Sequence, residues 1–291
     1  MGRTALYIFF TFLPVLFLSC VEKARPLHSF YFWKLQGDLT KEDTMLKNKL
    51  GISHSYIHYM DISWSEALNM AVPRATQQIN NLPGNEPYTP VIYIDNRVFE
   101  KSSQADMDTM ARRILRRIEA MTRNMEGIFA RNFFDNLHLP YDSNYQKRIT
   151  ATIDSVMRSR EGLVSEVQID CDWTEKTRDN YFLFLRQFKA LLKNKDLSVT
   201  IRLYPFKYRS KMGIPPADRG VLMCYNLSPI AKPETGNSVF DLSVLRQYLT
   251  PDEAYPLPLD LALPVFGWHP WFRGGKLQGI LYPYQMEVDT Q

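Results

Sequence analysis

Strand-like and helix-like segments alternate along most of this chain, and that alternation restricts its fold more than any other feature. The two-residue period of a strand is found at seven places, which are 29–35, 55–63, 89–99, 165–174, 197–205, 219–229 and 257–268. Helical patterns are expected at 40–51, 104–124, 143–159, 177–195 and 238–250, and a helical or irregular crossover at 64–82. Strands separated by helices favour a parallel β/α fold.

The number of these units favours a TIM-like (β/α)₈ barrel over a doubly wound sheet, so the expected class is α/β. The C-terminal end is irregular. The segment "HPWFRGGK" (269–276) is too short for a crossover helix, and 277–284 is a candidate for one more strand. Two alternatives follow: the barrel is incomplete, or its last strand pairs irregularly. Neither GxGxxG nor GxxxxGK[ST] occurs, which argues against nucleotide-binding versions of the fold.

The N-terminus has the pattern of a secretory signal. Arg3 precedes the apolar run "ALYIFFTFLPVLFLS" (5–19), which ends before Cys20. Pro14 and the shortness of the run argue against a permanent membrane span. The ending "LFLSC" resembles a bacterial lipobox, in which Cys20 becomes the lipidated first residue of the mature protein. Phe17 stands where that motif usually has Leu, as in the looser lipoboxes of Bacteroidetes-like bacteria.

This pattern predicts a signal peptide at 1–19, a lipid-anchored tether at 20–27 and a single β/α-barrel domain at 28–291. The expected location is extracytoplasmic, in a bacterial lipoprotein anchored to a membrane through Cys20, either periplasmic or at the cell surface. A cleaved secretory peptide with an incidental cysteine is the alternative.

Composition excludes several classes of protein. The chain is 45% hydrophobic and 23% charged, as globular proteins are, so wholesale disorder is not expected. A net charge of +4 without a basic, aromatic-rich stripe argues against a nucleic-acid partner. Five scattered histidines and the absence of a CxxC motif predict neither a metal site nor a cofactor. Cys171 and Cys224 fall in predicted buried strands and are expected to be free thiols.

The segment "SEVQIDCDWT" (165–174) places acids in what should be a buried strand. Val167, Ile169 and Cys171 alternate in it with Gln168, Asp170 and Asp172. In a β/α barrel, inward residues at the carboxyl ends of the strands line the active site. The apolar set is therefore expected under the helices, and the two aspartates in the barrel mouth.

The same reasoning places other residues at the ends of the strands. They are Asp61 or Met60, Asp95, Arg202, Tyr204, Tyr225, Asn226 and Trp268. Acids, tyrosines, an amide and a tryptophan around a barrel mouth are what a sugar site needs. Carboxylates carry out acid/base chemistry or bind hydroxyl groups, and an indole stacks on a pyranose ring.

Structural roles compete with this interpretation. Asp170 and Asp172 could accept hydrogen bonds from Arg202 and Tyr225 in a buried network, and Trp268 could simply pack. Asp61 and Asp95 are favoured as turn or cap residues. The arginines at 112, 113, 116 and 117 recur at helical spacing and are favoured as a solvated face over a role with anionic lipid or polyanions.

Two segments together resemble the chitinase-like barrels of glycoside hydrolase family eighteen. "VQIDCDWT" (167–174) and "VLMCYNLSP" (221–229) resemble strands four and six of those barrels, and "FGW" (266–268) resembles their late aromatic segment. The likeness extends to glycoside-hydrolase-like lipoproteins of Bacteroidetes type and loosely covers 28–284. It implies a glycan or polysaccharide partner, with Asp170 and Asp172 at the second and third acids of the D-x-x-D-x-D-x-E motif.

The chain departs from that motif where the chemistry is done. Val167 replaces the first acid, Asn226 replaces the aspartate of strand six, and Thr174 stands at the general-acid glutamate. Glu175 is one position further on, so it would face the site only if the strand ends or bulges at Trp173.

Two functions therefore stay open. The chain is a glycoside hydrolase that uses Asp170, Asp172 and Glu175, with a substrate site formed by Arg202, Tyr204, Tyr225, Asn226 and Trp268. Alternatively, it is a catalytically inactive carbohydrate-binding or scaffold lipoprotein that uses the same groove.

Overall fold

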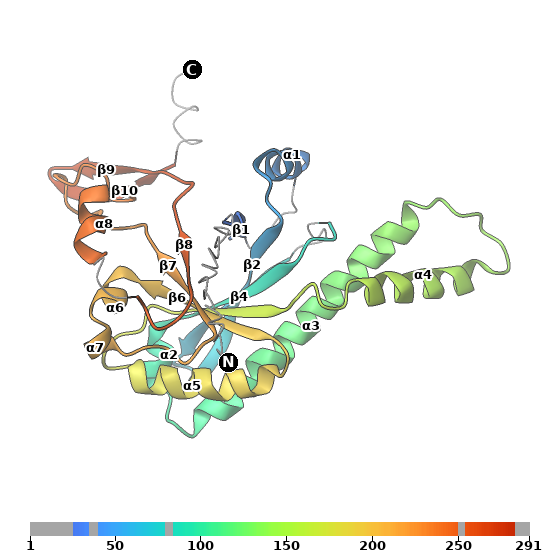
Figure 1. The fold of residues 1–291 in the computed structure, drawn as a ribbon, viewed down its shortest axis with the longest axis horizontal. Coiled ribbons are helices and arrows are strands. Elements are labelled where there is room, and N and C mark those ends of the chain that lie inside the picture. The colour runs from blue at the N-terminus through green and yellow to red at the C-terminus, as the bar shows by residue number, and fades with distance from the viewer. Residues whose placement is uncertain (1–25, 35–39, 79–83, 250–253, 283–291) are drawn as a thin grey trace, which may run out of the picture.

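The computed structural model describes residues 26–34, 40–78, 84–249 and 254–282. Its centre is a curled parallel sheet that forms an open half-barrel (Figure 1). The strands, in spatial order, are β1 (Ser29–Phe32), β2 (His54–Ser65), β4 (Tyr88–Ile94), β5 (Glu166–Asp170), β6 (Asp196–Arg202), β7 (Arg219–Met223) and β8 (Leu259–Ala262). Every neighbouring pair on this path is parallel. The expected α/β class and parallel sheet are confirmed.

Eight helices are described in the same parts of the chain. They are α1 (Lys41–Leu50), α2 (Asn96–Lys101), α3 (Asp106–Asp135), α4 (Tyr145–Ser159), α5 (Arg178–Leu192), α6 (Leu203–Lys207), α7 (Arg209–Met212) and α8 (Leu242–Tyr248). Helix α1 shows how local sequence sets its ends. Thr40 and Asp43 form a reciprocal capping box, and Gly51 closes the helix with a left-handed φ of 63°. None of the described helices is long and apolar enough to cross a membrane.

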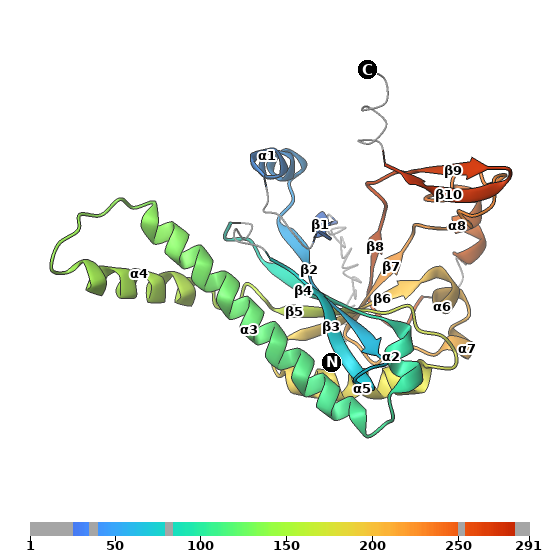
Figure 2. The ribbon, with the colours of Figure 1, turned by 180° about the vertical axis from the view of Figure 1, so that it is seen from behind.

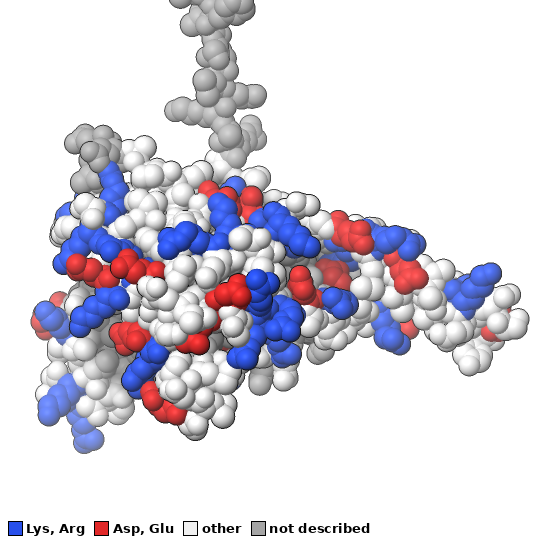
Figure 3. Space-filling model, turned by 90° about the horizontal axis from the view of Figure 1, so that it is seen from below, with Lys and Arg blue, Asp and Glu red and all other residues white. Residues whose placement is uncertain are grey.

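The main core lies between the convex face of the sheet and helices α3 and α5, which run beneath it (Figure 1). Val167, Ile169 and Cys171 of the β5 segment are at most 1% exposed and pack there, as the alternation predicts. On the outer side of these helices, basic and acidic side chains are intermixed (Figure 3).

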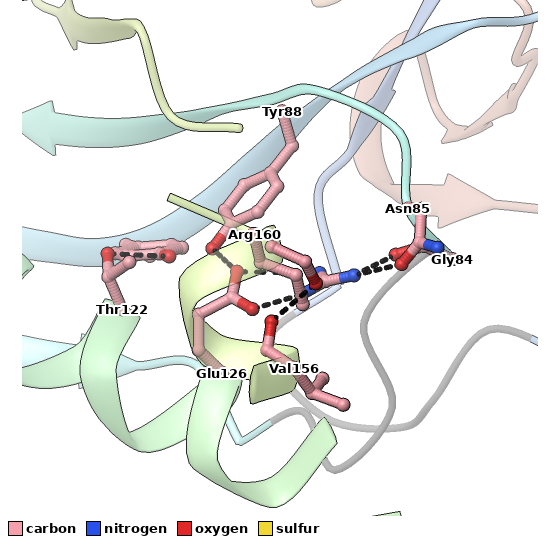
Figure 4. Close-up of polar contacts among 9 residues, drawn as sticks. Gly84, Asn85, Tyr88, Thr122, Glu126, Val156 and Arg160 are labelled. Carbon is pink, nitrogen blue, oxygen red and sulfur yellow. Dashed lines mark hydrogen bonds and ion pairs between the residues drawn. The ribbon is translucent and has the colours of Figure 1, made fainter. Parts of the chain in front are cut away.

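A buried polar network ties α3 and α4 to β4 (Figure 4). Arg160, which directly follows α4, is hydrogen-bonded to Glu126 of α3 and donates to the carbonyl of Gly84 and to Asn85 Oδ1. Tyr88 of β4 donates its hydroxyl to Glu126 Oε1 at 2.8 Å, and burial raises the pKa of Tyr88. Beyond this network, α3 and α4 project from the sheet as a helical arm (Figure 1).

A crossover was expected at 64–82, but the described part of that segment (64–78) is mostly strand, so that prediction was wrong. Strand β3 (Met70–Thr76) folds back antiparallel on β2 through a turn that includes Asn69 at a φ of 47°. Pro73 would break a helix, but an edge strand tolerates it because its missing N–H is not needed for a second ladder.

The C-terminal end is irregular, as expected. Of the two alternatives, an incomplete barrel or an irregularly paired last strand, the structure has the incomplete barrel. Segments 269–276 and 277–284 contribute β9 (His269–Arg273) and β10 (Lys276–Leu281), which form a separate antiparallel pair. Gly274 and Gly275 make the turn with φ values of 56° and 72°. Segment 277–284 is therefore not a barrel strand, and within the described residues β8 and β1 do not pair.

Candidate functional site

The concave face of the half-barrel carries polar and aromatic side chains from successive strands. Tyr31 of β1 donates its hydroxyl to Gln168 Oε1 of β5 at 2.7 Å, across the interior of the curled sheet. Gln168 donates to Ser198 Oγ at 3.2 Å, and the Ser198 hydroxyl donates to Glu166 Oε1 at 2.5 Å. The acids and amide of the β5 segment are thus partly explained by a hydrogen-bonded interior.

Asp170 lies one layer nearer the carboxyl ends of the strands. Its carboxylate accepts a hydrogen bond from the Thr200 hydroxyl at 2.6 Å. Burial raises the pKa of Asp170 to about 6, and the nearby Asp172 adds to that effect, while Thr200 and Arg202 oppose it. A carboxyl group with this pKa changes its protonation state near neutral pH.

Asp172 follows just beyond β5, with its side chain 57% exposed and 3.5 Å from Arg202 Nε. Tyr225 lies beside the same charges: burial raises its pKa to about 12, and Asp170 contributes. The structure thus brings together four residues singled out from the sequence, namely Asp170, Asp172, Arg202 and Tyr225.

The two other candidate aspartates have different places. Asp95 caps α2 by accepting a hydrogen bond from the Arg97 N–H, so it is the cap residue that was favoured. Asp61 instead lies 2.7 Å from His58 Nε2, and the His58 ring stacks on Trp33 at 4.3 Å. The Asp61 charge also contributes to the raised pKa of Asp170, which places it at the edge of the same site.

Sequence reasoning missed Tyr93, His58 and Trp33. Tyr93 pairs in register with both Asp61 and Asp170, and the alternation of β4 could have identified it. Burial raises the pKa of Tyr93 to about 12. His58 and Asp61 are three residues apart and meet because β2 shifts register between His58 and Met60, which simple alternation does not predict.

Glu175 lies outside this cluster of contacts. The strand ends at Asp170, so the two-residue period no longer fixes which way Glu175 points. Its carboxylate is 2.9 Å from Lys211 Nζ, and both side chains are more than half exposed. The Thr174 N–H donates to Thr177 Oγ1 at 2.9 Å in the turn that leads into α5.

The remaining candidates lie around the rim. Asn226 has a left-handed φ of 55° and donates its N–H to the Val239 carbonyl. Tyr204 of α6 is 47% exposed and packs on Tyr208, with ring centroids 4.6 Å apart. Neither residue has a described contact with Asp170 or Asp172.

An aromatic row leads from the acids toward the C-terminal end. Phe266 meets Tyr225 edge-on at 5.8 Å and packs on Trp268 at 5.4 Å. The Trp268 indole donates to Ser238 Oγ at 2.9 Å, which fixes the orientation of its ring. Phe266, which joins the two predicted residues, is 45% exposed.

Both described cysteines lie in the main core. Cys171 and Cys224 are buried and free, as expected. In the parts of the chain that the structure describes, no group of three or more His, Cys, Asp or Glu side chains is arranged to hold a metal ion.

No protein-family model matches the chain, and no curated protein matches it. Among solved structures, the chain is similar to the crystal structure of the spore cortex-lytic enzyme SleL of Bacillus cereus, with 13% sequence identity and a TM-score of 0.37. The alignment covers 90% of this chain and 56% of that enzyme, so the chain spans less than two thirds of the enzyme's length.

Proposed function

We propose that the protein binds a glycan chain at the concave face of the half-barrel and hydrolyses a glycosidic bond there. The observation that carries this proposal is the carboxyl pair at the end of β5. Burial raises the pKa of Asp170 to about 6, whereas Asp172 is exposed and ion-paired with Arg202. Glycosidases use two carboxyl groups in different environments, one to donate a proton and one to act as a carboxylate.

In this proposal, Asp170 donates a proton to the leaving glycosidic oxygen as its bond to the anomeric carbon breaks. A water molecule then adds to that carbon and returns a proton to the Asp170 carboxylate. Asp172 supplies negative charge beside the developing oxocarbenium ion, and Arg202 orients it. Glu175 is the other candidate for the proton donor, but its ion pair with Lys211 favours Asp170 in that role. Phe266 and Trp268 offer stacking surfaces for sugar rings next to the acids.

A second candidate function is carbohydrate binding without hydrolysis. It is favoured by two observations at the place where the family-eighteen motif has its glutamate. Thr174 has no acidic proton to donate, and Glu175 is engaged by Lys211. The protein would then hold a glycan on the same concave face, as a binding or scaffold protein.

Reducing-end release from a panel of polysaccharides, together with affinity electrophoresis on the same glycans, separates the two functions. A hydrolase gives product at a rate that falls as the pH rises above about 6, because Asp170 loses its proton there. A binder gives retention without product on every glycan. If no glycan is either retained or hydrolysed, both proposed functions are overturned.

We also propose that the protein is held outside the cytoplasm by a lipid on Cys20, which lies outside the described residues. The apolar run and the "LFLSC" ending support this proposal. Growth with a clickable fatty acid should label the wild type and leave Cys20→Ser unlabelled. Wild-type protein released into the medium without label would contradict it.

A further inference from the structure

A cavity lies on the opposite side of the sheet from the carboxyl pair. It is lined by the β2–β3 hairpin and the N-terminal half of α3, which lie side by side (Figure 2). Its volume is about 350 Å³. That is within the roughly 300–1,000 Å³ of small-molecule sites. Its apolar wall includes Met60, Ile62, Met110 and Ile114. Methionine side chains adapt readily to the shape of a bound alkyl chain.

The rim of this cavity carries unbalanced positive charge. Arg113 and Arg117, one helical turn apart on α3, both line the cavity and are exposed. Neither makes a hydrogen bond or an ion pair with another described residue. Asp106 also lines the cavity, but its carboxylate already accepts hydrogen bonds from the N–H and the hydroxyl of Ser103. The lining therefore includes two arginines without a described partner and one aspartate that is already hydrogen-bonded.

The neighbouring arginines of the same helix differ. Arg112 donates to Asp108 Oδ2 at 2.8 Å, and Arg116 donates to the carbonyl of Arg112. Neither of the two lines the cavity. The four arginines share one spacing in the sequence but form two different pairs. Arg113 and Arg117 are the pair without a described hydrogen bond or ion pair.

Trp64 gives the cavity a spectroscopic probe. Its ring lines the cavity, and its buried indole N–H has no acceptor in the described parts of the chain. A ligand that enters the cavity changes the surroundings of this ring.

We propose that this cavity binds one amphipathic anion, with an alkyl chain among the methionines and isoleucines and a carboxylate or phosphate head on Arg113 and Arg117. The apolar wall excludes a purely polar anion, and the two free arginines favour an anion over a neutral amphiphile. This site is independent of the glycan site on the concave face.

Calorimetric titration of the full chain with dodecanoate, dodecyl phosphate and dodecanol, each below its aggregation threshold, tests the proposal. At least one of the two anions should bind with one molecule per chain, and the tighter one identifies the head group. Dodecanol should bind roughly fivefold more weakly, the scale of two partly exposed charge contacts. Acetate and inorganic phosphate alone should show no binding.

Two double variants locate the head group. Arg113→Gln with Arg117→Gln should reduce the affinity for the anion to that for dodecanol. Arg112→Gln with Arg116→Gln is the matched control and should bind as the wild type does. An equal loss in both double variants would overturn the proposal, as would dodecanol binding as tightly as the anions or binding of inorganic phosphate alone.

Two further variants locate the alkyl chain. Ala71→Phe adds a ring beside Trp64, on the face of β3 that lines the cavity, and should abolish binding, with circular dichroism as the check on folding. Trp64→Phe should retain binding and lose the change in tryptophan emission that dodecanoate produces in the wild type. Emission changes that persist in Trp64→Phe, or full binding by a folded Ala71→Phe, would place the ligand elsewhere and contradict the proposal.

Discussion

The two faces of β5 differ in what surrounds them. On the convex face, Val167 and Ile169 are at most 1% exposed and pack against helices. On the concave face, Gln168 and Asp170 make hydrogen bonds to β1 and β6. One strand thus stabilises the fold with one face and carries the candidate site on the other. Substitutions on the concave face should therefore lower activity, and substitutions on the convex face should lower stability.

The largest expected effect is on catalysis from the concave face. If the protein is a hydrolase, Asp170→Asn and Asp172→Asn should each lower turnover by about 10²–10⁴-fold, the range of a lost acid/base group. Glycan retention in affinity electrophoresis should stay nearly unchanged. Asp179→Asn, a solvent-exposed acid on α5 that pairs with Arg178, is the control and should keep full turnover. If folded Asp170→Asn keeps its turnover, the proton donor is elsewhere; if this variant cannot fold, the carboxyl group is structural.

On the convex face, the same strand should respond through stability. Ile169→Ala should lower the free energy of unfolding by about 2–5 kcal/mol, because it leaves a cavity in the main core. Urea unfolding measures this change. Ile280→Ala on β10 is the matched control: that side chain is 37% exposed, so its truncation should change stability by less than about 1 kcal/mol. Equal losses of unfolding free energy in the two variants would contradict the assignment of Ile169 to the core.

A pH titration sharpens the comparison at a single group. The folded pKa of Asp170 is about 6, above its ordinary value of 3.8, so the folded state favours the protonated form. Below about pH 4 the group imposes no penalty, and stability should fall as the pH rises through 6. The loss should be at most about 3 kcal/mol for this shift. Urea unfolding between pH 4 and 7 should show this loss in the wild type, and a smaller one in Asp170→Asn. Identical profiles for the two proteins would refute the raised pKa.

The smallest expected effect is at the aromatic row. Trp268→Ala should weaken glycan binding by about 1–3 kcal/mol, the scale of burying a large apolar side chain. Affinity electrophoresis on the glycan that binds best gives the comparison. Trp271 on the separate β9–β10 pair is 50% exposed, so Trp271→Ala should leave the affinity unchanged. A stronger loss in Trp271→Ala than in Trp268→Ala would move the sugar site to the hairpin.

Much of the candidate site followed from the alternation within strands. The period of β5 separates Ile169 from Asp170, and the parallel arrangement brings Asp170 near Arg202 and Tyr225. Tyr93 could have been found by the same rule. Glu175 could not be placed, because its direction depends on where the strand ends and on Lys211, a residue far along the chain that engages it.

Features that depend on near neighbours in the chain can be predicted from the amino-acid sequence. The capping box of Thr40 and Asp43 and the two faces of β5 follow from local hydrogen bonding and side-chain period. Tertiary structure alone decided that β3 folds back on β2, that the described sheet stays open, and that Tyr31 meets Gln168 from 137 residues away. These contacts result from how the sheet curls and which surfaces pack, and no local pattern of residues encodes those long-range energies.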